Sequence, residues 1–169
     1  MAITVVLESE GGPKALKREL RPATTEAMND VGEDWAEEKL PGHFTTRAAT
    51  KYGYQKRSRK FMIRKASGYT DQYGVRHAGH QRALVWSGES ERMMTAGARI
   101  KATSKGVDVK MLAPKHLYAR RKDLRQPDKA AETTRLSDDE VTGYQAMLAD
   151  GVADHLNRIR TRETERIAG

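Results

Sequence analysis

Apolar residues recur at helical spacing between Pro13 and Leu40. They lie about four residues apart, or at a multiple of that step, at Leu16, Leu20, Ala27, Val31 and Trp35. This spacing places them on one face of a long N-terminal helix, which the Pro41-Gly42 pair ends. Pro22 interrupts the stripe and leaves two alternatives: a kink at Pro22, or a short first helix and a longer second one that starts there.

A second helical stripe lies near the C-terminus. Ser137 and Glu140 form a capping box, in which the Ser137 hydroxyl accepts from the amide of Glu140 and the Glu140 side chain reaches back to the amide of Ser137. The apolar face that follows contains Val141, Tyr144, Leu148, Val152, His155, Leu156 and Ile159. Gly143 and Gly151 weaken this helix, and we expect the polar residues 160–169 to form a frayed tail.

Strand-like alternation occurs in two places. Ala2–Glu8 is rich in Ile, Val and Thr and predicts an N-terminal strand. Residues 98–112 alternate on both sides of Ser104-Lys105-Gly106 and predict a β-hairpin, with Gly106 at positive φ in a two-residue loop. The register that follows pairs Ile100 with Met111 and Ala102 with Val109.

These elements predict an α+β fold. A small antiparallel or mixed sheet, made of the N-terminal strand and the hairpin 98–112, is packed by the long N-terminal helix and the C-terminal helix. Ser87 is the predicted N-cap of a further short helix from Gly88 to about Ala96. We expect residues 1–169 to form a single domain, with residues 113–135 as a surface loop.

Residues 45–83 keep no helical or two-residue hydrophobic period, and we expect an extended basic arm inserted in the domain. The stretch from Arg47 to Trp86 contains ten Lys or Arg residues and one acid, Asp71, so it carries +9 of a whole-chain charge of +8. Tyrosines and glycines are interleaved through it, for example in Tyr52-Gly53-Tyr54. The arm therefore combines charge with aromatic side chains.

Composition limits what the chain can be. Apolar residues make up 37% and charged residues 32%, a thin supply of core residues, so we expect part of the chain to be ordered by a partner. The absence of cysteine excludes disulfides, thiolate metal sites and cysteine nucleophiles. No apolar run approaches the ~20 residues that a membrane span requires, and no basic leader with an apolar core is present. We expect synthesis in a cytoplasm and no membrane partner.

Candidate catalytic groups are few. His77 and His80 lie three residues apart and His43 precedes the arm, but Asp71 is the nearest acid and Gly79 argues against a helix there. Most acids fall on predicted helices, where solvation and the helix dipole explain them. There is no glycine-rich phosphate loop and no nucleophile elbow. We expect no catalysis, no cofactor and no metal, and a nuclease built on these histidines is the weakest hypothesis.

Three interpretations of the arm stay open. Its cations and tyrosines could contact phosphates and bases of nucleic acid, form a solvated loop, or order against an acidic neighbouring subunit. We favour the third, because no recognisable DNA- or RNA-reading element accompanies the arm. The candidate phosphate contacts are Lys51, Lys56, Lys60, Lys65, Arg120 and Arg121.

Several short motifs resemble the neck and tail-completion, or head-tail joining, proteins of tailed bacteriophages. They are His43-Phe44, Arg47-Ala48-Ala49, Lys51-Tyr52-Gly53-Tyr54, Lys56-Arg57, Gly79-His80 and Leu84-Val85-Trp86-Ser87-Gly88-Glu89, followed by a hairpin and a capped helix. Ala83 stands where a proline is common in that family. The resemblance covers His43 to about Leu156.

The resemblance implies a structural virion protein that forms a ring at the head-tail junction or the tail end. Its partners would be further copies of itself and the head-tail connector or tail-tube proteins, and packaged DNA is a further possible contact. The candidate residues for contact between subunits are Tyr52, Tyr54, Arg57, Arg59, Phe61, Arg64 and Trp86. Leu84 and Trp86 would anchor the end of the arm to the core, so deletion of residues 51–76 is expected to leave a folded core that does not assemble.

Overall fold

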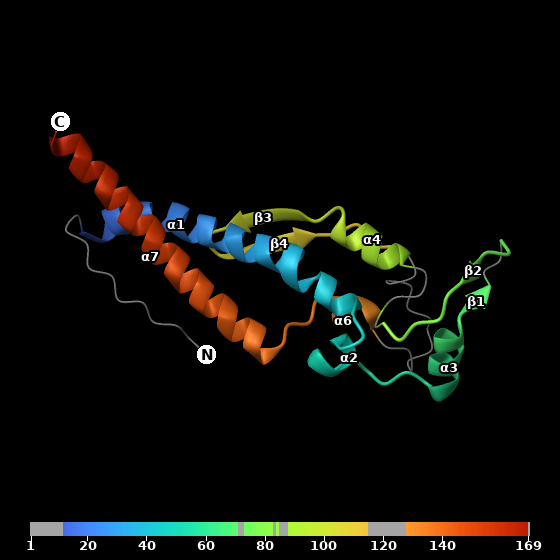
Figure 1. Cartoon of the computed structure of the whole chain (residues 1–169). Coiled ribbons are helices and arrows are strands. Elements are labelled where there is room, and N and C mark those ends of the chain that lie inside the picture. The colour runs from blue at the N-terminus through green and yellow to red at the C-terminus, as the bar shows by residue number, and fades with distance from the viewer. Residues whose placement is uncertain (1–11, 71–72, 83, 85–87, 115–127, 169) are drawn as a thin grey trace. The chain divides into compact units, whose positions relative to one another are not determined.

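A computed structural model describes residues 12–70, 73–82, 84, 88–114 and 128–168. The chain divides into two compact units. Unit 1 comprises residues 1–35, 99–110 and 138–169, and unit 2 comprises residues 36–98 and 111–137. The α+β class is confirmed, since both units combine helices with short antiparallel strands (Figure 1). That the two units act as a single domain stays a prediction, and the expected strand Ala2–Glu8 lies outside the described residues.

Unit 1 consists of two long helices and a hairpin. Helix α1 (Gly12–Asp34) packs against α7 (Asp138–Ala168) and against both strands of the hairpin, β3 (Arg99–Thr103) and β4 (Gly106–Lys110) (Figure 1). Glycine allows α1 to approach both neighbours closely. A Cβ on Gly32 would lie 2.7 Å from a methyl of Val107, and a Cβ on Gly151 would lie 3.0 Å from the Cβ of Ala27.

Helix α1 continues through Pro22, so the alternative of two separate helices is wrong. Proline removes one backbone hydrogen bond from the helix interior, and the packing of α1 against α7 and the hairpin offsets that loss. The helix also ends earlier than expected. A π-helical turn, η1 (Trp35–Lys39), follows it and leads into the 3₁₀ helix η2 (Pro41–Phe44).

The hairpin forms where predicted, but its register is different. Ile100 pairs with Val109 and Ala102 with Val107, two residues away from the expected partners. Gly106 is the first residue of β4, opposite Thr103, and it does not adopt a positive φ. Ser104 and Lys105 therefore form the loop, and the Thr103 side chain stabilises it by accepting from the amide of Lys105 (3.3 Å).

Helix α7 begins at Asp138, as the capping box predicts, with three acids in its first turn. Negative charge at this position complements the helix dipole. The helix continues to Ala168, through most of the stretch that was expected to fray. Fraying of residues 160–169 stays a prediction. Helical spacing had ended in the sequence after Ile159, but a long helix already nucleated can extend into polar residues.

Unit 2 is built from short elements, and the predicted arm is only partly extended. It contains α2 (Ala48–Lys51), α3 (Arg59–Ser67) and a two-stranded ribbon of β1 (Tyr69–Thr70) and β2 (Arg76–His77). The Ser58 hydroxyl caps α3 by accepting from the amide of Phe61 (3.3 Å). This local capping signal was missed because α3 has no apolar stripe.

Two further helices complete unit 2. Helix α4 (Glu89–Thr95) confirms the short helix, with Gly88 rather than Ser87 at the N-cap position; Ser87 lies outside the described residues. Helix α6 (Lys129–Thr133) corrects the end of the predicted surface loop 113–135, whose residues 115–127 lie outside the described residues. Asp128 caps α6 by accepting from the amide of Ala131 (3.0 Å), and Glu132 and Thr133 are buried.

Candidate functional site

The basic arm has an inner part that is buried in unit 2. His43, Tyr52 and Tyr54 form a stack of rings, the aromatic cluster, in which the His43 and Tyr52 centroids are 3.8 Å apart and the tyrosine centroids 5.9 Å apart. All three residues are buried, and Ala48 and Leu84 pack beside the tyrosines. The Tyr-Gly-Tyr motif thus belongs to the core, where Gly53 supplies a positive φ of 60° between the two rings.

A hydrogen bond inside the aromatic cluster fixes its polar atoms. The Tyr54 hydroxyl bonds with Nδ1 of His43. Burial, together with the neighbouring Tyr52 and Glu132, raises the pKa of Tyr54 above its ordinary value, so the hydroxyl stays protonated at neutral pH. The cluster is held by ring stacking and by this hydrogen bond.

Helix α6 holds the segment that carries the aromatic cluster. Glu132 forms an ion pair with Arg57 and accepts from the backbone amide of Gln55 (2.9 Å). The guanidinium of Arg135 donates to the carbonyls of Tyr52 (3.1 Å) and Gly53 (2.8 Å). Four polar contacts from a distant part of the sequence therefore fix residues 52–57.

These contacts remove several predicted residues from the list of surface contacts. Tyr52 and Tyr54 are core residues, and Arg57 is committed to Glu132, so none of the three presents a free side chain to a neighbouring subunit. Deletion of residues 51–76 would remove the buried residues Tyr52, Tyr54 and Lys65 from unit 2. That a folded core remains after this deletion stays a prediction. Leu84 does pack against the core, at a φ of 53°, whereas Trp86 lies outside the described residues.

Lys65 is also internal. It is 7% exposed, and its Nζ donates to the backbone carbonyl of Arg82. Burial and the nearby charges of Arg57, Arg82 and Lys129 lower the pKa of Lys65 to about 8. Lys65 therefore ties α3 to the segment at Arg82 and is not a phosphate contact. Arg82 in turn donates to the Phe44 carbonyl (3.0 Å) and forms an ion pair with Glu91 of α4.

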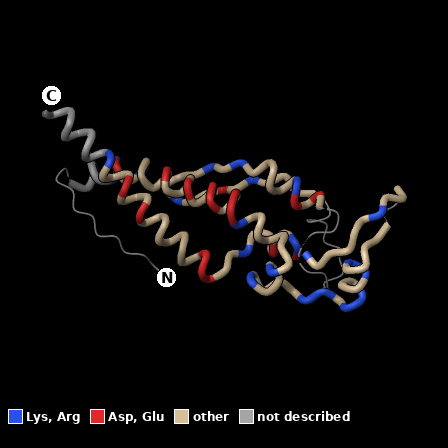
Figure 2. The backbone as a smooth tube through the Cα atoms, in the orientation of Figure 1, with Lys and Arg blue, Asp and Glu red and all other residues tan. Residues whose placement is uncertain are grey.

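The outer part of the arm is exposed and has a mixed character. Lys51 and Lys56 are exposed, as are Arg59, Lys60 and Arg64 of α3. Apolar side chains lie among these cations: the exposed fraction is 38% for Phe61, 41% for Met62 and 57% for Ile63. Beyond α3, Tyr73 and Val75 are also exposed. Figure 2 shows the Lys and Arg positions following one another from α2 into α3. Arg120 and Arg121 lie outside the described residues.

The histidines that suggested a metal site lie in different settings. His43 belongs to the aromatic cluster, and His77 stacks on Tyr69 across the β1–β2 ribbon with ring centroids 4.7 Å apart. The His80 amide donates to the Lys65 carbonyl (3.2 Å). Among the residues that the structure describes, no three His, Asp or Glu side chains gather in a way that could hold a metal ion.

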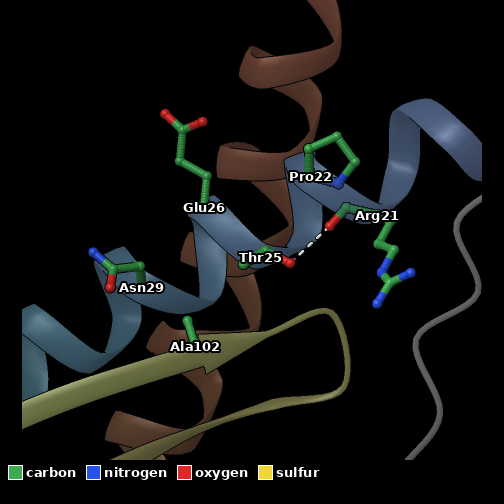
Figure 3. A pocket seen from close by; sticks show the side chains of 6 residues that line it. All are labelled: Arg21, Pro22, Thr25, Glu26, Asn29 and Ala102. Carbon is green, nitrogen blue, oxygen red and sulfur yellow. Dashed lines mark hydrogen bonds between the residues drawn. The ribbon is translucent and has the colours of Figure 1, made fainter.

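Unit 1 contains an open hollow of about 600 Å³ (Figure 3). Arg21, Pro22, Thr25, Glu26 and Asn29 of α1 line it together with Ala102 of β3. Its carboxylate is already engaged, because Glu26 pairs with His155 and Arg158 of α7. The Thr25 hydroxyl donates to the Arg21 carbonyl (2.8 Å). This lining offers one uncommitted charged group, Arg21, and no catalytic arrangement.

Sequence patterns missed the residues that hold the arm in place. Glu132 and Arg135 lie in a stretch with few apolar residues, and the ion pair with Arg57 joins positions 75 residues apart. The one local signal was Asp128, which stands at a typical N-cap position before α6. Among the described residues, no helix has both the length and the apolar character to cross a bilayer. Comparison with family models, with curated proteins and with solved structures finds no match to this chain.

Proposed function

We propose that the protein is a structural subunit of a tailed-phage virion, of the neck or tail-completion kind, and that it works as a homo-oligomeric ring. The observation that supports this proposal is the outer part of the arm, where exposed cations flank three consecutive exposed apolar residues, Phe61, Met62 and Ile63. Head-tail connector or tail-tube proteins are the expected neighbours, and the virion is the expected location. No catalytic step is assigned.

The physical reason is the cost of leaving apolar surface in water. Met62 and Ile63 are adjacent and exposed on a nine-residue helix, and burying such side chains stabilises an assembly by roughly 25 cal/mol per Å². Exposed apolar surface rimmed by charge is typical of protein interaction sites. In a ring, each arm is covered by a neighbouring subunit, which also offsets the entropy of ordering it.

Nucleic-acid binding by the same arm is the second candidate. The arm exposes five cations, Lys51, Lys56, Arg59, Lys60 and Arg64, and a tyrosine, Tyr73, which could stack on a base. This function makes no use of Met62 and Ile63. It predicts that each cation replaced by alanine weakens binding about equally for all sequences and reduces the salt dependence.

Binding to duplex DNA across a salt series, with the mass followed by light scattering in the same samples, separates the two functions. The structural proposal predicts a ring-sized mass and weak or absent binding near physiological salt. Tight binding that falls steeply with salt would favour the nucleic-acid function. A monomeric mass at every protein and salt concentration would overturn self-assembly.

A further inference from the structure

The exposed face of α3 needs an occupant of specific chemistry. Arg59, Met62, Ile63 and Ala66 fall on one side of the helix at spacings of three and four residues, and all four are exposed. Lys60 is exposed at the flank of this α3 face. A partner surface should therefore be anionic and should have room for the bulky side chains of Met62 and Ile63.

Helix α7 presents a surface with those two properties. At helical spacing it exposes Asp139, Gly143, Ala146, Asp150, Ala153 and Asp154. This α7 face has three carboxylates, no Lys or Arg, and only small residues between the carboxylates. Figure 2 shows acidic positions along α7, in contrast to the basic positions from α2 to α3. Among the described side chains, no ion pair engages these three aspartates.

Gly143 lies in the N-terminal half of the α7 face, and the described residues of one subunit give no structural reason for a glycine there. A glycine in a helix interior costs roughly 0.5–1 kcal/mol relative to alanine. For Gly151 the reason is the close approach of α1, because a Cβ there would lie 3.0 Å from the Cβ of Ala27. A Cβ on Gly143 would meet no atom of the described residues within 4 Å. A second chain that approaches closely would account for the glycine, as α1 does for Gly151.

We propose that the α3 face of one copy docks on the α7 face of a second copy. The inference rests on the proposed self-assembly and names its contact: Arg59 and Lys60 face the aspartates, and Met62 and Ile63 lie over Gly143 and Ala146. The α7 face is long enough to hold α3, since α3 is about 13 Å long and Asp139 to Asp154 spans about 22 Å of helix. Each copy carries one face of each kind, so the contact is head-to-tail and propagates until a ring closes.

Disulfide trapping tests the contact directly, because the chain has no cysteine of its own. Met62→Cys and Ala146→Cys are made as separate full-length variants and mixed under mild oxidation. A disulfide-linked dimer that contains one copy of each variant is expected in the mixture, and each variant alone should give much less. Assembled protein without this mixed dimer would overturn the docking proposal and leave self-assembly standing. A monomeric mass without the dimer would overturn both.

A bulky residue at Gly143 gives a second test. Gly143→Gln should fold at least as well as the parent chain, because glutamine is the better helix former, but it should weaken association at least tenfold by light scattering. Gly106→Gln is the matched control, since a Cβ on Gly106 also meets no atom within 4 Å, and it should assemble normally. Association of Gly143→Gln within twofold of the parent chain would contradict the proposal.

Discussion

Unit 1 and unit 2 differ both in charge and in what holds them together. Unit 1 contains 12 Lys or Arg and 15 Asp or Glu residues, a net charge of −3, whereas unit 2 contains 19 and 8, a net charge of +11. Unit 1 is held by long elements in close contact, with small residues where α1 meets its neighbours. Unit 2 is held by buried polar contacts at Glu132, His43 and Lys65. The proposed contact between copies would bring these opposite charges together.

Removal of a buried charge from unit 2 should have the largest effect. Glu132→Ala removes the carboxylate that pairs with Arg57, whose side chain is only 19% exposed. It also removes the hydrogen-bond acceptor of the Gln55 amide. Breaking a buried ion pair in this way typically costs about 3–5 kcal/mol. We expect hydrogen exchange to rise over residues 48–57 and to stay unchanged over α1 and α7.

Glu91→Ala provides the control for that experiment. It breaks the more exposed pair with Arg82, whose side chains are 41% and 27% exposed, and solvent-exposed pairs contribute about 0–1 kcal/mol. A loss of stability as large as that of Glu132→Ala would mean that burial does not distinguish the two ion pairs. Equal deprotection of unit 1 and unit 2 by Glu132→Ala would show that the units unfold together.

Overpacking in unit 1 should have an intermediate effect. The new methyl of Gly32→Ala would lie 2.7 Å from Val107 and 2.8 Å from Ile100, both β-branched and stiff. Overpacking of this kind costs about 1–3 kcal/mol, and we expect a net loss of about 2 kcal/mol in urea unfolding. Gly143→Ala is the matched control and should gain up to about 1 kcal/mol, because its methyl meets no atom. Equal effects would mean that the hairpin does not pack closely on α1.

Regular elements of unit 1 were predictable because their causes are local. The stripes around Ala27 and Leu156, the capping box at Ser137 and the alternation in residues 98–112 each lie within one element. The predicted hairpin register was wrong by two residues. Gly106 suggested a loop at Lys105-Gly106, whereas the loop is Ser104-Lys105, where the Thr103 hydroxyl accepts from the amide of Lys105. Cooperative extension of α7 past Ile159 likewise has no local signal.

The sequence proposed the arm as the candidate site, and the structure shows which residues of the arm are exposed and which are buried. Charge counting located the arm, and Arg59 and Lys60 are exposed as a contact surface requires. It could not separate them from Lys65, which burial and the Arg82 carbonyl remove from the surface. The tyrosines were misassigned for a related reason, since their burial depends on His43 and on Arg135, more than 80 residues away. A cation count carries no information about such partners.

Titration of Lys65 should give the smallest effect and should separate the two units by pH. Its pKa is about 8 in the folded chain, against an ordinary value of 10.5 for a solvated lysine, so between these values the unfolded chain binds more protons and unit 2 gains stability as the pH rises. From pH 8 to pH 9 the gain is at most about 1.4 kcal/mol. Lys65→Met should abolish it in urea unfolding followed over unit 2, and a gain that persists in this variant would assign the titration elsewhere. The series should end below pH 10, where the raised pKa of Tyr54 acts in the opposite direction.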